Sequence, residues 1–134
     1  ETAYSQTTEI PDERRCLQRI LQHQVRVETD DRTCTRTLGE LVETAAHRRP
    51  DRDVSPSQAA DGMGRYGLKL QQDPPTLLIS NTAEALATIL RDTAWNHSWA
   101  AVLSRLPGAT RLGPQRFSGA GTVSRAVGLP IDSL

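Results

Sequence analysis

Residues 25–81 read VRVETDDRTCTRTLGELVETAAHRRPDRDVSPSQAADGMGRYGLKLQQDPPTLLISN, and this stretch carries clear start and stop signals for its elements. The alternating residues of 25–28 predict a short strand. A polar turn follows, and residues 32–35 are expected to continue as a return strand or as an extended lead-in. Thr37 followed three residues later by Glu40 forms a capping box, which predicts the start of a helix.

A second capped helix and a hairpin follow in the same stretch. Ser55, Pro56 and Gln58 combine a cap, a first-turn proline and a capping-box partner. Alternating apolar residues over 66–70 and an apolar run over 76–80 predict two strands joined by a loop. The order is therefore a short strand, two capped helices and a two-stranded hairpin.

The flanking sequence predicts further elements on both sides. Pro11 and the acids after it start a first helix, and Asn81 and Asn96 are expected to cap a fourth and a fifth helix. A C-terminal hairpin is expected over 115–129, turning at the glycines of 119–121.

These elements together predict an α+β fold. The central part of this fold is expected to be a winged helix-turn-helix, with three helices and a β-hairpin wing. Two further helices and a C-terminal β-hairpin extend it. The expected organisation is a flexible arm or linker tail over 1–9, a winged-helix domain over 10–81 and a C-terminal extension over 82–134 packed on it. A chain of 134 residues suits one compact core.

Charge is balanced overall but uneven along the chain. The net charge is zero, residues 1–31 hold four arginines against seven acids, and residues 93–131 hold four arginines and no acid. No apolar run is long enough to span a bilayer, and no signal peptide is recognisable, so a cytoplasmic location without membrane contact is expected. Cys16 and Cys34 are expected to be buried free thiols.

A winged helix places its third helix in the major groove of DNA and contacts phosphates with neighbouring loops and the wing. The candidate DNA-binding residues lie in the loop before that helix, on the helix itself, on the wing and on the C-terminal hairpin. They are Arg48, Arg49, Arg52, Ser57, Gln58, Arg65, Lys69, Arg111, Arg116 and Arg125.

Two simpler interpretations remain open for these residues. Asp51, Asp53 and Asp61 lie close by in sequence and would neutralise much of the third-helix face, leaving an ordinary solvated surface. Arginines on an edge hairpin can also serve to prevent aggregation. Gln58 has a competing role in the capping box, which would occupy its side chain.

The sequence offers no catalytic or metal-binding constellation. His23, His47 and His97 lie far apart, with no cysteine or acid at ligand spacing, so no metal and no cofactor are expected. No nucleophile with a base beside it and no phosphate-cradling glycine loop is recognisable, so neither an enzyme nor a small-molecule substrate is expected.

Several short motifs resemble the C-terminal domains of phage- or mobile-element-type primase-helicases. They are RYGLKL at 65–70, LLISN at 77–81, RLPGA at 105–109 and SRAVGLP at 124–130, with Trp95 and Trp99 between them. The resemblance implies an accessory domain that binds a duplex or an origin, with the motor in upstream domains. The chain begins at Glu1 and its one methionine is Met63, which also suggests a piece of a longer protein.

The expected function is therefore nucleic-acid binding, with DNA as the partner, in the service of a larger replication-type protein. The alternative is a protein interaction module that uses the winged-helix scaffold without touching DNA. An electropositive third-helix surface would favour DNA, and an apolar or acidic one would favour protein.

Overall fold

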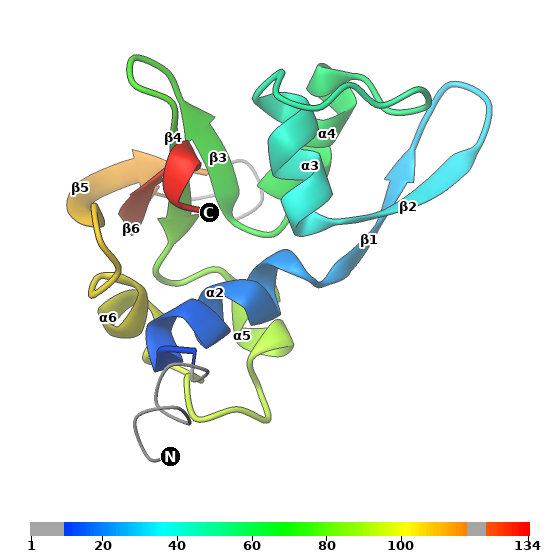
Figure 1. Cartoon of the computed structure of the whole chain (residues 1–134). Helices are drawn as coiled ribbons and strands as arrows, with labels where there is room; N and C mark the ends of the chain where they lie inside the picture. Colours follow the sequence, from blue (N-terminus) through cyan, green and yellow to red (C-terminus); the bar gives the residue numbers. More distant parts are fainter. Residues whose placement is uncertain (1–9, 118–122) are drawn as a thin grey trace, which may run out of the picture.

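The computed structural model describes residues 10–117 and 123–134 and shows a mixed α+β fold with two antiparallel sheets (Figure 1). The helices are α2 (Asp12–Leu21), α3 (Leu38–Ala45), α4 (Pro56–Gly64), α5 (Glu84–Ile89), α6 (Trp99–Leu103) and a short 3-10 helix, η1 (Ile131–Ser133). The strands are β1 (Gln24–Glu28), β2 (Thr33–Thr37), β3 (Leu68–Gln71), β4 (Thr76–Ser80), β5 (Thr110–Arg116) and β6 (Val123–Pro130). The predicted arm over 1–9 and the predicted turn over 119–121 lie outside the described residues.

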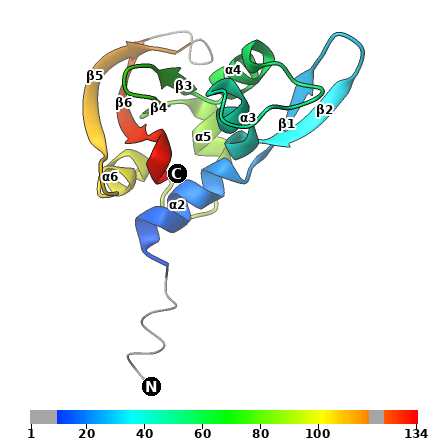
Figure 2. The same ribbon diagram turned by 45° about the horizontal axis from the view of Figure 1, so that its top comes forward.

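The two sheets occupy different sides of the molecule. Strands β1 and β2 form a hairpin that projects beside α4, whereas β5 forms the far edge of the four-stranded sheet in both ribbon views (Figures 1 and 2). Helix α2 runs below both, and α6 packs against it and against β6. A binding surface on β5 and a binding surface on the β1–β2 hairpin would therefore lie on different sides of the molecule.

Both predicted capping boxes are confirmed. At the start of α3, Thr37 Oγ1 accepts the Glu40 amide at 3.1 Å, and Glu40 Oε1 accepts the Thr37 amide at 2.9 Å. Ser55 and Gln58 exchange the same two bonds at the start of α4, at 3.1 and 3.0 Å. Each box satisfies two backbone donors that a helix start otherwise leaves unpaired.

Replacing Ser55 with alanine is expected to lower the free energy of unfolding by about 1 kcal/mol, because the first turn of α4 loses its cap. Ser57 is the matched control, since it is exposed on the same turn and its side chain makes no hydrogen bond within the described residues. Urea unfolding of the two alanine variants measures the difference. Equal stability of the two variants would mean that the cap contributes nothing.

Helix α4 contains glycine where helix α3 and strand β1 approach it. A Cβ added at Gly62 would lie 3.1 Å from Leu41 Cδ1 and 3.5 Å from Val27 Cγ2. A glycine inside a helix costs up to about 1 kcal/mol relative to alanine. Here the close packing against α3 and β1 offsets that cost.

The wing and the C-terminal hairpin form one sheet, with strand order β3-β4-β6-β5. The sequence predicted two separate hairpins, but β4 pairs with both β3 and β6, so that Leu77 lies between Leu70 and Leu129. The reason is the composition of β4, in which Leu77, Leu78 and Ile79 are all fully buried. An apolar strand without alternation needs cover on both faces and therefore takes a central position.

The outer face of this sheet carries a small core of its own. Leu78, Phe117 and Ala126 are buried together, and Leu112 packs against them. Gly128 leaves room for this contact, because a Cβ there would meet Leu78 and Leu112 at 3.3 and 3.4 Å. Helices are therefore needed to cover only the inner face.

The predicted caps of the last two helices are wrong. Helix α5 begins after Ala83 with no side-chain cap, because the Asn81 amide donates to the Arg125 carbonyl at 2.9 Å and continues the pairing of β4 with β6. Helix α6 begins after Ser98, and Asn96 does not cap it. Sheet pairing at the end of β4 thus takes precedence over the local cap signal.

The main core contains buried side chains from all five α-helices, from the β1–β2 hairpin and from one face of the four-stranded sheet. Cys16, Leu17 and Ile20 of α2 are buried in it, as the helical spacing predicted. Cys16 and Cys34 are both buried free thiols, which confirms that prediction. Burial, together with the charge of Asp12, raises the pKa of the Cys16 thiol to about 12, so this thiol is unreactive near neutral pH.

Candidate nucleic-acid interface

The loop between α3 and α4 carries three of the candidate arginines, and one of them is balanced by acids. Arg48 Nη1 lies 2.7 Å from Asp132 Oδ1, and its Nε lies 3.7 Å from Glu43 Oε2. Asp132 is 84 residues away in sequence, so no local pattern pointed to this pair. Arg48 therefore joins the end of α3 to η1 and offers little free charge.

Two of the three acids expected to neutralise the third-helix face, Asp51 and Asp53, are paired with Arg36 instead. Arg36 Nε and Nη2 donate to the two carboxylate oxygens of Asp51 at 2.6 and 3.0 Å, and Asp53 Oδ2 lies 3.5 Å from Nη2. Asp51 Oδ1 also accepts the amides of Asp53 and Val54 at 2.9 and 3.2 Å. The hydrogen bonds from Arg36 in particular lower the pKa of Asp51 well below its ordinary value, so the carboxylate stays ionised.

Arg49 and Arg52 consequently keep their charge exposed at the start of α4. Both are exposed, and neither has an ion pair or a side-chain hydrogen bond with any residue that the structure describes. Sequence reasoning did not single out Arg36. The sequence pattern that could have indicated it is the pair Asp51 and Asp53 on either side of Arg52. Two acids against one arginine leave a negative charge that a cation from another element can balance.

Helix α4 itself presents a nearly neutral surface. Ser57 and Asp61 are exposed, and Asp61 is the one charged residue within the helix. Gln58 Oε1 accepts the Ser55 amide, so the capping box does occupy this side chain. Arg65, at the C-cap, is exposed and donates to the Arg26 carbonyl at 3.3 Å. The helix therefore brings no free cation of its own to a groove.

The wing lysine is tied to the neighbouring hairpin. Lys69 on β3 donates to the Arg116 carbonyl at 2.8 Å, and its Nζ lies 5.4 Å from the centre of the Phe117 ring. These contacts join the two edge strands, β3 and β5, across the outer face of the sheet. The ammonium group of Lys69 is therefore engaged in contacts within the protein and is less available to bind a phosphate.

The remaining candidates, Arg111, Arg116 and Arg125, share one face of the β5–β6 pair, which we call the arginine face. Arg111 lies opposite Val127 and Arg116 opposite Val123, while Arg125 lies between those two valines on β6. Alternate residues of a strand point to the same side, so the register places all three arginines together.

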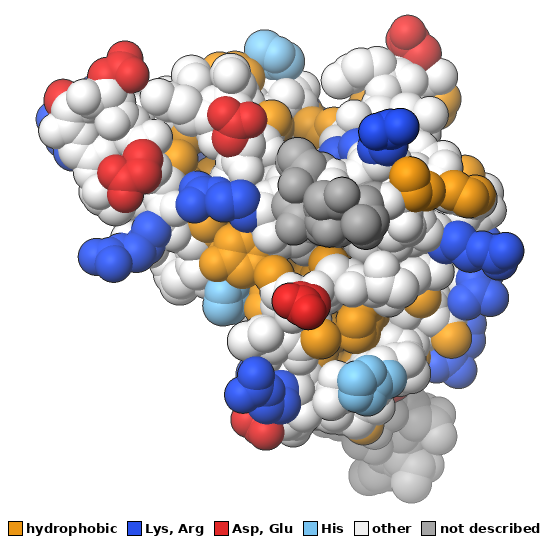
Figure 3. Space-filling model, turned by 180° about the vertical axis from the view of Figure 1, so that it is seen from behind, with side chains coloured by type: hydrophobic (Ala, Val, Ile, Leu, Met, Phe, Trp, Pro, Cys, Tyr) orange, Lys and Arg blue, Asp and Glu red, His pale blue; other side chains and the backbone are white. Residues whose placement is uncertain are grey.

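The arginine face is open and its charge is unbalanced. All three side chains are exposed, and none forms an ion pair with the residues described in 10–117 and 123–134. A row of Lys and Arg side chains follows the side of the molecule where β5 lies (Figure 3). Arg105, the fourth arginine of this region, lies 3.6 Å from Glu13 of α2 and is partly balanced.

Other kinds of site find little support in the described parts of the chain. These parts hold no group of three or more His, Cys, Asp or Glu that could bind a metal ion. No helix between residues 10 and 117, or after residue 122, has the length and apolar character to cross a membrane. No family model matches the chain, and no curated protein sequence or solved structure does.

Proposed function

We propose that this chain binds nucleic acid, DNA in the first instance, through phosphate contacts from the arginine face. The observation that carries the proposal is the register of β5 and β6, which gathers Arg111, Arg116 and Arg125 on one side without a neutralising acid among the described residues. Guanidinium groups bind phosphate in a bidentate way and keep their charge at any physiological pH.

A second contact would come from the start of α4. Helices α3 and α4 followed by β3 and β4 have the order of a winged helix, and Arg49 and Arg52 precede α4 with their charge exposed. In a winged-helix arrangement these arginines would contact phosphates beside the groove. The resemblance to primase-helicase C-terminal domains supports a role as the accessory domain of a larger replication protein.

A protein interaction module is the second candidate, and the surface of α4 favours it. Ser57, Ala60 and Asp61 are exposed there, with one carboxylate and no cation among them. The variant Ala60→Arg separates the two roles of this helix. Tighter DNA binding by the variant would place α4 near phosphate, and unchanged binding would leave the helix available to a protein partner.

The test of the main proposal is fluorescence anisotropy of a labelled duplex over a series of salt concentrations. Each phosphate contact contributes about 0.9 to the slope of log affinity against log salt concentration. Replacing Arg111, Arg116 and Arg125 together with glutamine is therefore expected to flatten the slope by about 3 and to weaken binding at low salt.

The matched control removes the same charge elsewhere. Arg15, Arg26 and Arg91 are exposed and lie outside the arginine face, so their triple glutamine variant changes net charge equally. This control is expected to keep most of the slope. The proposal is wrong if the wild-type chain does not bind at low salt, or if both triple variants lose the same affinity.

A further inference from the structure

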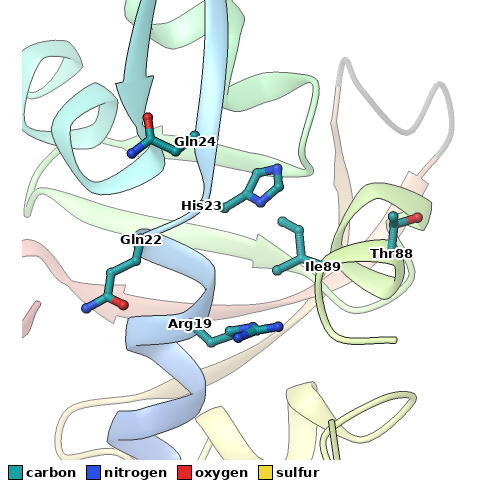
Figure 4. Close-up of a pocket in the computed structure, with 6 residues that line it drawn as sticks. All are labelled: Arg19, Gln22, His23, Gln24, Thr88 and Ile89. Carbon is teal, nitrogen blue, oxygen red and sulfur yellow. The ribbon is translucent and has the colours of Figure 1, made fainter. Parts of the chain in front are cut away.

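A groove opens where the end of α2 and the start of β1 face helix α5 (Figure 4). Its first lobe has a volume of about 510 Å³ and is lined by Arg19, Gln22, His23, Gln24, Thr88 and Ile89. Figure 4 shows Arg19 and His23 extending toward α5, where Ile89 lies, while Gln22 and Gln24 point the other way. The arginine and the imidazole therefore face the apolar side of α5.

A second lobe continues the groove toward the end of α4. It has a volume of about 390 Å³, shares three residues with the first lobe, and adds Arg65, Tyr66 and Ala85. The rings of His23 and Tyr66 lie 5.3 Å apart at an angle of 55°. The two lobes, which we call the His23 groove, thus have a pair of aromatic rings at their junction and one arginine on each side.

The charge of the groove is positive and its centre is apolar. No carboxylate belongs to the described lining of either lobe. Arg19 has no ion pair among the described residues, and Arg65 is held only by the Arg26 carbonyl at 3.3 Å. Burial, together with the charge of Arg19, lowers the pKa of His23, so its ring is neutral at pH 7 and offers an aromatic surface.

We propose that the His23 groove binds a nucleoside phosphate, either as a free nucleotide or as one unit of a single-stranded nucleic acid. The base stacks against the ring of His23, beside which the tilted Tyr66 ring packs, with Ile89 as the opposing apolar wall. The phosphate takes its hydrogen bonds from Arg19 or Arg65. The volumes of the lobes lie in the range of sites that bind ligands of this size.

This inference goes beyond the proposed function and does not depend on it. The groove uses α2, β1, α5 and the two residues that follow α4, whereas the arginine face belongs to β5 and β6. The triple glutamine variant of the arginine face is expected to leave the groove intact. The two proposals can therefore fail separately.

The test is a two-dimensional NMR titration of the full chain with four probes. They are adenosine monophosphate, adenosine, inorganic phosphate, and a short single-stranded oligonucleotide with a terminal phosphate. Adenosine monophosphate or the oligonucleotide is expected to shift the signals of His23, Tyr66 and Thr88, and to bind more tightly than adenosine or phosphate alone. Shifts by the nucleotide identify a free ligand, and shifts by the oligonucleotide alone identify a strand.

Variants connect the shifts to the groove. Replacing Arg19 and Arg65 with glutamine is expected to weaken binding by about tenfold, because charged hydrogen bonds to phosphate are lost. Thr88→Phe fills the groove from an exposed position and is expected to abolish binding without changing the charge. The control pair Arg15→Gln and Arg91→Gln is expected to bind as the wild type does.

Three outcomes would overturn the proposal. The first is the absence of shifts with either the nucleotide or the oligonucleotide. The second is a set of shifts that lies outside the groove. The third is unchanged binding in both the double arginine variant and Thr88→Phe, each shown to be folded by its own NMR spectrum.

Discussion

Replacing Gly67 with alanine is expected to destabilise the protein by about 3 kcal/mol, as the sum of backbone strain and steric overlap. Gly67 has a φ of 78°, in the left-handed region that alanine avoids. An added Cβ would lie 2.5 Å from Ala83 Cβ and 3.2 Å from Ser80 Cβ. Both neighbours belong to the buried junction of β4 and α5, so neither has room to move away.

The control for this prediction is Gly113→Ala. Gly113 lies on β5 without a positive φ, and nothing lies within 4 Å of a Cβ added there. Urea unfolding is expected to show a large loss of stability for Gly67→Ala and little change for Gly113→Ala. A loss below about 1 kcal/mol at Gly67 would not exceed the backbone cost of placing alanine in the left-handed region and would contradict the expected overlap.

The consequence of Gly67 reaches beyond stability, because this residue links α4 to β3. The Gly67 carbonyl accepts the Ser80 amide at 2.8 Å, and its own amide donates to the Gly64 carbonyl at 3.1 Å. The chain thus passes from helix to sheet within three residues. This passage fixes α4 relative to the four-stranded sheet, and it also holds Tyr66 at the His23 groove.

Local signals predicted the elements whose partners are close in sequence. The capping boxes at Thr37 and Ser55 each join residues three apart, so the sequence pattern contained the whole interaction. The same reasoning failed at Asn81, because its backbone pairs with β6, more than forty residues further along the chain. A side-chain cap contributes about 1 kcal/mol, similar to one backbone hydrogen bond, so the burial of the apolar strand β4 decides which of the two forms.

The sequence identified the arginines of the candidate interface, but it could not show which of them lack an acidic partner in the fold. Arg48 and Arg49 are neighbours in the sequence, yet Arg48 is paired with Asp132 and Arg49 has no ion pair among the described residues. Only the tertiary fold decides which arginine meets an acid. The arginine face likewise depends on the pairing of β5 with β6, and the shift in register between Leu112 and Gln115 cannot be read from the pattern.

Replacing Asp51 with asparagine is expected to lower the free energy of unfolding at pH 7 by about 2 kcal/mol, because the carboxylate charge facing Arg36 and the hydrogen bond from Arg36 Nε to Asp51 Oδ2 are lost. Asparagine retains an oxygen that can accept the amides of Asp53 and Val54, so the substitution isolates the ionic contribution. Asp30→Asn, at an exposed turn position, is the control. Arg36→Gln provides the second side of a double-mutant cycle, in which Asp51→Asn is expected to cost much less.

The pH dependence gives an independent test of the same pair. Asp51 has a lower pKa in the folded chain than in the unfolded chain, where an aspartate titrates at about 3.9. Its stabilisation is therefore present in full above that unfolded value and is lost as the pH falls through and below it. Urea unfolding from about pH 5 to about pH 2 is expected to show the wild-type chain and Asp51→Asn converging in stability. A constant difference over that range would mean that the Asp51 carboxylate does not stabilise the start of α4 through its charge. The pairing of Asp51 with Arg36 would then not explain why Arg49 and Arg52 keep their charge exposed.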